Sequence, residues 1–126
     1  MSKTKVLQTT TTIAKTTQTL IGEIIETGYY DYLTLYFTYT KGDETGLTIV
    51  PSFLHEYTGT AHPFLEWTAT AGAKTATPST LTETVTRDGY ITLDIRGHEY
   101  VQFTQGGTAN DGTPTGTLSA SYLLKG

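Results

Sequence analysis

The chain has 126 residues and a formal net charge of -4, with 8 Lys plus Arg, 12 Asp plus Glu and no Cys. This length suits a single domain that buries roughly two thirds of the surface exposed by its unfolded chain. The acidic balance argues against a nucleic-acid partner, which would need a basic stripe, and the lack of Cys excludes disulfides and thiol nucleophiles. Thirty Thr, 13 Gly and 9 Tyr indicate strands and turns rather than helices.

Residues 1–16 carry three Lys, six Thr and no acidic residue. This stretch has too little apolar surface to pack by itself, so we predict an N-terminal arm followed by a β-sandwich domain over residues 17–126. The arm is expected to fray or to order as an added strand on a neighbouring subunit. We expect no signal peptide and no membrane partner, because no apolar run is long enough for either.

The clearest strand pattern lies at residues 30–40, where apolar residues alternate with Thr and Tyr. A turn at 41–45 predicts a hairpin whose return strand is 46–54. Pro51 within that return strand predicts an edge position or a bulge, because proline cannot donate to a ladder. The residues of the first strand expected to face inward are Leu33, Leu35, Phe37 and Tyr39.

A first long loop is expected at 55–63, then a strand at 64–71 with Trp67 in the core, and a second loop at 72–79. The further elements expected are strands at 81–86, 90–95, 100–104 and 116–124 and a polar loop at 105–115. About eight antiparallel strands without a helix predict a single all-β sandwich of jelly-roll or immunoglobulin-like architecture.

The turn at 87–89 is expected to join two strands of a second hairpin. A two-residue Asp-Gly turn would set Glu83 opposite Asp94, two like charges. A three-residue loop with Gly89 in a G1 bulge avoids this and pairs Val85 with Ile91, so we favour the bulge.

No stretch specifies an enzyme. The histidines His55, His62 and His98 lack the spacing of a zinc site, and there is no nucleophile elbow or phosphate loop. Oxygen-rich stretches such as 110–112 are more typical of plain turns than of calcium sites. We therefore expect no catalytic residue, no metal and no cofactor. Acidic residues on strands usually lie on the solvated face, so a catalytic pair of the glycosidase type is not expected. The acidic residues considered for such a pair are Glu56, Glu66, Glu83, Asp94 and Glu99.

The aromatic residues are the candidates for an interface or ligand surface. Aromatic residues at alternate strand positions are typical of a core or subunit contact, yet they also suit a sugar platform. A carbohydrate-binding module therefore stays as an alternative function. The candidate residues are Tyr30, Tyr32, Tyr36, Tyr57 and Trp67.

The chain resembles the small β-sandwich virion proteins of tailed bacteriophages over about residues 28–124. The likeness lies in hairpin order and in Thr, Gly and Tyr usage, in the succession YDYLTLYFTYTKGDETGLTIVPSF, a Trp-bearing strand, RDGYITLDIRGHEYVQFTQGG and GTLSASYLL. It implies a non-enzymatic virion structural protein made in the host cytoplasm, a capsid decoration or auxiliary protein before a tail or neck component.

The resemblance also implies partners. These are the major capsid protein or another virion protein, and copies of the chain itself. A homo-oligomer is expected, a trimer before other states, because decoration proteins of this group commonly sit at capsid threefold positions. The N-terminal arm would then lie on a neighbour or on the shell.

Overall fold

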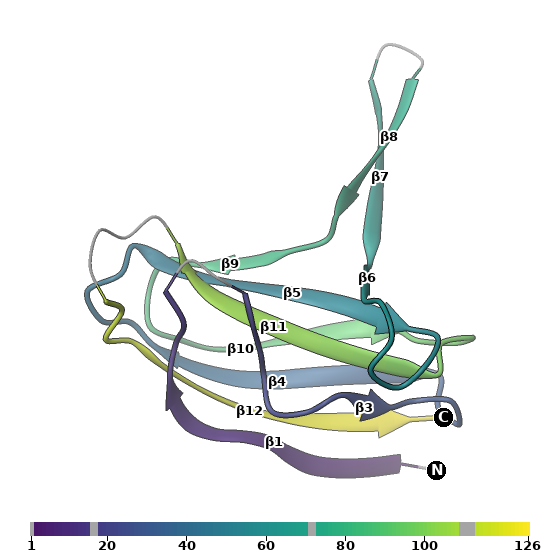
Figure 1. Ribbon diagram of the computed structural model, residues 1–126, viewed down its shortest axis with the longest axis horizontal. Helices are drawn as coiled ribbons and strands as arrows, with labels where there is room; N and C mark the ends of the chain where they lie inside the picture. The colour runs from purple at the N-terminus through teal and green to yellow at the C-terminus, as the bar shows by residue number, and fades with distance from the viewer. Residues whose placement is uncertain (1, 16–17, 71–72, 109–112) are drawn as a thin grey trace.

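The computed structural model describes residues 2–15, 18–70, 73–108 and 113–126, with side chains described except at 66–70, 73–78 and 108. All of its regular elements are strands, which form two antiparallel sheets and a separate two-stranded ribbon (Figure 1). Nothing in the described ranges is a helix with the length and apolar character to cross a membrane. The prediction of an all-β sandwich is confirmed.

One layer, sheet A, has its strands in the order β1-β12-β4-β10. β4 lies between β12 and β10, so the stretch with the strongest alternation is an interior strand. Its four predicted inward residues are buried, whereas Tyr32, Tyr36 and Thr38 on its other face are exposed. The strands of sheet A are β1 (Ser2–Thr12), β4 (Tyr32–Thr40), β10 (Arg87–Asp94) and β12 (Thr117–Lys125).

The second layer, sheet B, is built on two long strands that pair with each other, β5 (Gly46–Leu54) and β11 (Tyr100–Thr108). Two short strands flank β11, namely β2 (Thr19–Leu20) and β3 (Ile25–Glu26). Two others flank β5, namely β6 (His62–Pro63) and β9 (Leu81–Glu83). The remaining strands, β7 (Leu65–Thr70) and β8 (Ala73–Pro78), pair only with each other.

The core lies between the two sheets and is almost entirely aliphatic and aromatic. Each fully buried Leu or Ile stabilises the fold by roughly 1.5–3 kcal/mol relative to an exposed one. Leu118, Ala120 and Tyr122 of β12 are buried as predicted. The other main members of the core are Leu33, Leu35, Tyr39, Leu47, Ile49, Ile95, Val101, Phe103 and Leu124.

Both predicted hairpins are wrong because the chain crosses between layers at these turns. β4 pairs with β12 and β10, whereas β5 pairs with β11 in the other sheet. Likewise β9 pairs with β5 and β10 pairs with β4, so Val85 and Ile91 are not partners. Strands with one strongly apolar face bury it against the opposite sheet, and a short connection then becomes an arch between layers.

Gly89 has a different role from the predicted bulge. It lies inside β10, directly opposite Phe37 of β4, and its φ is not positive. A Cβ built on Gly89 would lie 2.5 Å from Cζ of Phe37. The glycine is therefore needed for the close approach of this ring, not for a turn.

The N-terminal segment is a strand of its own sandwich, which corrects the expectation of an arm on a neighbour. β1 pairs with β12 from Ser2 opposite Lys125 to Thr12 opposite Thr117, with two register shifts. Leu7 and Ile13 are buried in the core. A Thr-rich stretch gains its backbone hydrogen bonds from the edge of sheet A, so two apolar side chains suffice to fix it.

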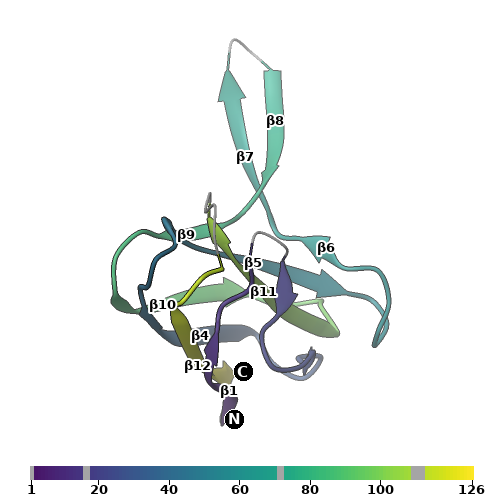
Figure 2. The ribbon, with the colours of Figure 1, turned by 60° about the vertical axis from the view of Figure 1, so that its left-hand side comes forward.

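Residues 64–79 also differ from expectation. Residues 73–78 form strand β8 rather than a loop, and β7 and β8 make a ribbon that projects from the sandwich (Figures 1 and 2). The predicted core position of Trp67 falls among residues whose side chains are not described. Because β7 pairs with β8 in a separate ribbon, it is not a strand of either sandwich sheet.

Candidate functional site

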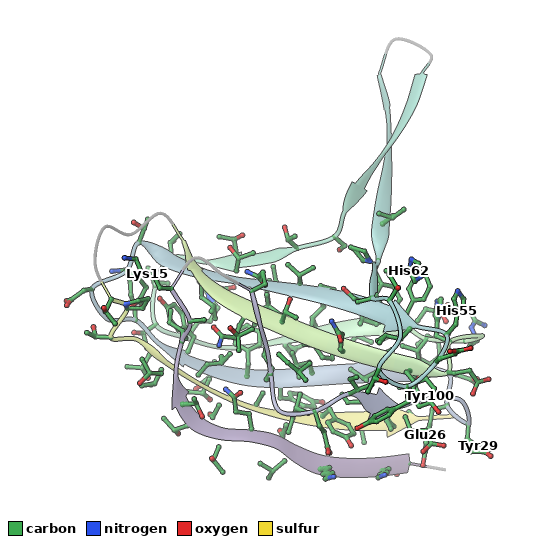
Figure 3. The ribbon with its side chains drawn as sticks, in the orientation of Figure 1. Lys15, Glu26, Tyr29, His55, His62 and Tyr100 are labelled. Atoms are coloured by element: carbon green, nitrogen blue, oxygen red, sulfur yellow. The ribbon has the colours of Figure 1, made fainter. Side chains whose placement is uncertain are left out.

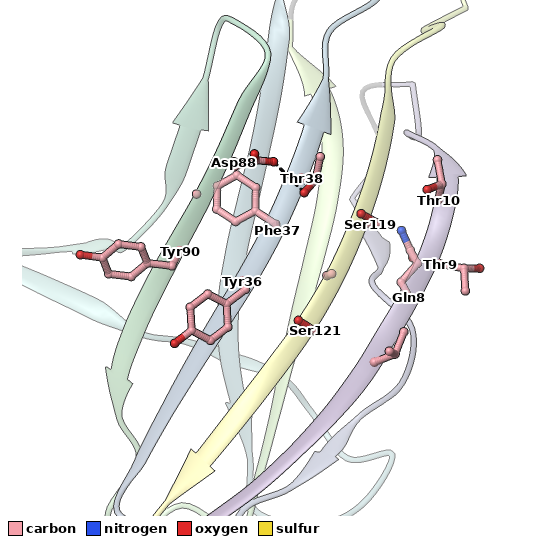
Figure 4. A pocket seen from close by; sticks show the side chains of 13 residues that line it. Gln8, Thr9, Thr10, Tyr36, Phe37, Thr38, Asp88, Tyr90, Ser119 and Ser121 are labelled. Atoms are coloured by element: carbon pink, nitrogen blue, oxygen red, sulfur yellow. Dashed lines mark hydrogen bonds between the residues drawn. The ribbon is translucent and has the colours of Figure 1, made fainter.

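A groove of about 570 Å³ lies on the outer face of sheet A and is lined by all four of its strands (Figure 4). Strand alternation creates it, because residues at even positions of β4 and β10 point away from the core. The side chains that carry its chemistry are Gln8, Tyr36, Thr38, Asp88, Tyr90, Ser119 and Ser121.

Two tyrosines form one wall of the groove. Tyr36 of β4 and Tyr90 of β10 lie directly opposite each other in the ladder, with ring centroids 6.4 Å apart and planes inclined by 42°. The two residues are 46% and 69% exposed. Neither ring is part of the core, so both present an aromatic surface to solvent.

The rest of the groove is polar. Thr38 Oγ1 donates a hydrogen bond of 2.8 Å to Asp88 Oδ1 beside the tyrosines. Across the groove, Gln8 Nε2 donates to the Leu118 carbonyl at 3.1 Å, which fixes this amide next to a bulge of β1. Among the described residues of the lining, Asp88 is the single charged side chain, so they give the groove no positive charge.

The predicted candidate aromatics do not gather in one place. Of the four with described side chains, only Tyr36 lines the groove. Tyr32 lies under the Arg96 guanidinium, 5.6 Å from ring centroid to Cζ, and Tyr30 packs against the core. Tyr57 lies in a turn with its ring 5.8 Å from that of Tyr100. Trp67 is in β7, and its side chain is not described.

Sequence reasoning missed most of the groove. Tyr90 and Asp88 come from a strand whose partner was misassigned, and Gln8 comes from the supposed arm. The alternation of β10 marks its outward residues, but only the register with β4 brings Tyr90 beside Tyr36.

A second cluster surrounds Phe53 at the end of β5 and the base of the ribbon, where Figure 3 labels His55 and His62. The Phe53 ring centroid lies 5.7 Å from that of His55, 5.4 Å from His62 and 4.2 Å from His98. Burial lowers the pKa of His98, and the neighbouring His55 lowers it further, partly opposed by Asp94. Across the described residues no three His, Cys, Asp or Glu are placed to hold a metal ion.

A buried carboxylate, Glu44, supports the arch between the sheets. It accepts hydrogen bonds from the Tyr39 hydroxyl, from the Gly42 N–H at 2.8 Å and from the Gly116 N–H at 2.9 Å. Burial alone would raise the pKa of Glu44, but these bonds outweigh it and lower the pKa to about 2. A Cβ at Gly116 would lie 2.2 Å from Glu44 Oε2, so this glycine makes room for the carboxylate.

Two of the acids considered for catalysis form ion pairs with arginines, Glu83 half-buried and Asp94 exposed. Glu83 lies 2.5 Å from Arg87, and Asp94 lies 2.5 Å from Arg96. The hydrogen bond from the Arg96 guanidinium lowers the pKa of Asp94 to about 2. Each of these carboxylates is thus paired with an arginine that is close to it in sequence.

The ribbon leaves sheet B at Pro51. On one side of β5, β9 pairs with it up to Ile49 and β6 pairs with it from Ser52. The row of strands along this side is therefore interrupted at Pro51, which offers no N–H. The Phe64 N–H donates to the Pro51 carbonyl at 3.2 Å, and the Phe64 carbonyl accepts from Ser79 N–H at 2.6 Å. This last bond closes the base of the ribbon.

No family model and no curated protein matches the sequence. Among solved structures, the chain is similar to the SPBc2 prophage-derived protein YomS, with a TM-score of 0.60 and 17% identity over 98% of this chain and 92% of that one. It is also similar to a chain in the structure of infectious bursal disease virus Gx strain, with a TM-score of 0.53 and 10% identity. That match covers 98% of this chain and 31% of the other. The β-sandwich is thus shared with a prophage-derived protein and with a virus structure.

Proposed function

We propose that the chain is a non-enzymatic structural protein of a bacteriophage virion, a capsid decoration or auxiliary protein that docks on the particle and stabilises it. The fold shared with a prophage-derived protein and a virus structure supports this assignment. Its partners are the major capsid protein or another virion protein and, in a trimer, copies of itself. A tail or neck location is the alternative within the same class.

The projecting β7–β8 ribbon is the observation that carries the proposal. Its six residue pairs run from Leu65 opposite Pro78 to Thr70 opposite Ala73, a length of about 20 Å at 3.3 Å per residue. An isolated two-stranded ribbon is only marginally stable in water. A partner that packs against the ribbon would supply the missing second layer.

The residues of the ribbon suit such a partner. Leu65, at its base, is 50% exposed, and the ladder sets Trp67 opposite Ala76. Aromatic residues are enriched in the buried centres of protein interfaces, where a few of them contribute most of the binding energy. The ribbon is therefore the docking element of the proposed function.

The test removes the ribbon without touching the sandwich. Because Phe64 and Ser79 already share a backbone hydrogen bond, a short Gly-Ser linker can replace residues 65–78. We expect this variant to fold normally but to bind virions that lack the protein at least roughly tenfold more weakly in co-sedimentation. Tyr29→Ala, at a residue that is 82% exposed and lies outside the ribbon, is the matched control and should bind normally.

Two results would count against the proposal. Equal binding by the ribbon-less variant would exclude the ribbon as the docking element. Failure of the intact chain to associate with any particle would exclude the virion role itself.

A further inference from the structure

The groove on sheet A faces away from the ribbon. Figure 1 shows the ribbon leaving from the side of sheet B, and Figure 4 shows the groove on the outer surface of sheet A with sheet B behind it. We propose that this groove binds a segment of a neutral polysaccharide. The inference does not depend on docking through the ribbon, although such docking would leave the groove open to solvent.

The tyrosine wall supplies the apolar part of saccharide recognition. The C–H face of a pyranose ring packs on an aromatic ring as other apolar surface does, while the phenol hydroxyl remains available for hydrogen bonds. Tyr36 and Tyr90 offer two such rings side by side, one on β4 and one on the adjacent strand β10 of a rigid sheet. Little conformational freedom would be lost on binding, because the backbone of both strands is already fixed.

The floor and far wall supply hydrogen bonds. One oxygen of Asp88 already accepts from Thr38, which orients the carboxylate, and a carboxylate has about four acceptor sites in all. Ser119 and Ser121 of β12 line the groove between the tyrosines and Gln8. Each hydroxyl both donates and accepts, so this surface matches a ligand with many hydroxyl groups.

Other ligand classes fit less well. Phosphates, nucleic acids and acidic glycans need cations, and the lining residues that the structure describes include none. A quaternary ammonium group is recognised by an aromatic cage, whereas here two rings form a single wall. An apolar peptide would bury the Asp88 carboxylate and the serine hydroxyls without partners, at a cost in affinity.

The extent of the groove indicates an oligosaccharide rather than one sugar. It crosses four paired strands, which span about 14 Å at roughly 4.8 Å per strand spacing. Such a length accommodates a short run of sugar units, with one stacked on the tyrosines and the next over the serines.

The test is a glycan array that carries neutral gluco-, galacto- and mannohexaoses beside acidic and amine-bearing glycans, followed by titration of the best neutral hexaose. We expect binding to at least one neutral hexaose. Tyr90→Ala should weaken it by roughly tenfold and Asp88→Asn by several-fold. Tyr57→Ala, at an exposed tyrosine outside the groove, is the matched control and should bind as the intact chain does. A circular dichroism spectrum checks that each variant is folded.

Three outcomes would overturn the inference: no binding to any neutral glycan, binding that survives both groove substitutions, or binding confined to charged glycans. The ribbon-less variant should keep its saccharide affinity, and the groove variants should still associate with virions. Failure of the groove and failure of the virion role are therefore separate results.

Discussion

β1 and the β7–β8 ribbon both lie at the periphery of the molecule, but they differ in what surrounds them. β1 pairs with β12 and places Leu7 in the core. Ile13, the residue after the strand, is also buried there. The ribbon pairs only with itself, and Leu65 at its base is half exposed. The polar segment is thus integrated through its pairing with β12, whereas the more apolar ribbon pairs with itself and projects.

The largest expected effect separates these two segments directly. Deletion of residues 2–13 removes a whole edge strand and two buried side chains, each worth about 2–5 kcal/mol when truncated. That loss is comparable with the entire stability of a small domain, roughly 5–15 kcal/mol. Replacement of 65–78 by a linker should change stability by less than about 1 kcal/mol. Urea denaturation of both variants measures the difference, and equal losses would contradict the contrast.

A single substitution sharpens the same contrast. Ile13→Ala should lower the free energy of unfolding by about 2–4 kcal/mol, because Ile13 is 4% exposed and its removal leaves a cavity. Val6→Ala in β1, the strand that ends just before Ile13, is the matched control, since Val6 is 63% exposed, and should cost less than about 0.5 kcal/mol. Similar effects of the two substitutions in thermal unfolding would show that β1 is not anchored through the core.

Glu44 also anchors the end of β1. Its carboxylate accepts from the Gly116 N–H, and the Gly116 carbonyl accepts from the Ile13 N–H at 3.0 Å. Glu44→Gln should cost about 1–3 kcal/mol at pH 7, because a charged acceptor of several buried donors is lost. Exposed Asp43 provides the control Asp43→Asn, which should be nearly neutral.

The pH dependence at Glu44 has a definite sign. Its pKa in the folded protein is lowered to about 2 from an ordinary 4.5, so its contribution is full above pH 4.5 and is lost as the pH falls toward 2. Chemical denaturation between pH 6 and 3 should therefore show a steeper loss for the intact chain than for Glu44→Gln. Parallel curves would contradict this assignment.

The smallest effect concerns the base of the ribbon. The pKa of His98 is lowered in the folded protein, so the unfolded chain takes up this proton first, and stability falls as the pH drops below about 6.5. We expect the Tm of the intact chain to fall by roughly 1–3 °C more than that of His98→Gln between pH 7 and 5. The charged and titratable groups that act on the pKa of His98 are His55 and Asp94, and an identical fall in both proteins would exclude His98 as the cause.

Local pattern predicted much of the fold. The alternation of 30–40 identified β4 and its buried face, and the ranges expected for β5 and β12 agree with the structure to within one residue. Pairing was less predictable, because nearness in sequence favours a hairpin where the apolar faces instead require an arch between sheets. Pro51 predicted an edge position or a bulge, whereas β5 pairs with β11 on one side and, on the other, with β9 before Pro51 and β6 after it.

The candidate site was harder to predict for the same reason. Tyr36 was identified as an outward aromatic residue, but its groove depends on the register that brings Tyr90 and Asp88 alongside it. Gln8 enters only because β1 adds to β12. These are contacts between distant parts of the chain, and alternation within one strand carries no information about them.

The docking role of the ribbon is tested most directly by an electron cryo-microscopy map of virions that carry this chain. We expect the β7–β8 ribbon of every copy to be buried against a neighbouring protein, with the outer face of sheet A turned toward solvent. A map in which the ribbon stands free in solvent while sheet A packs on the particle would contradict the proposal.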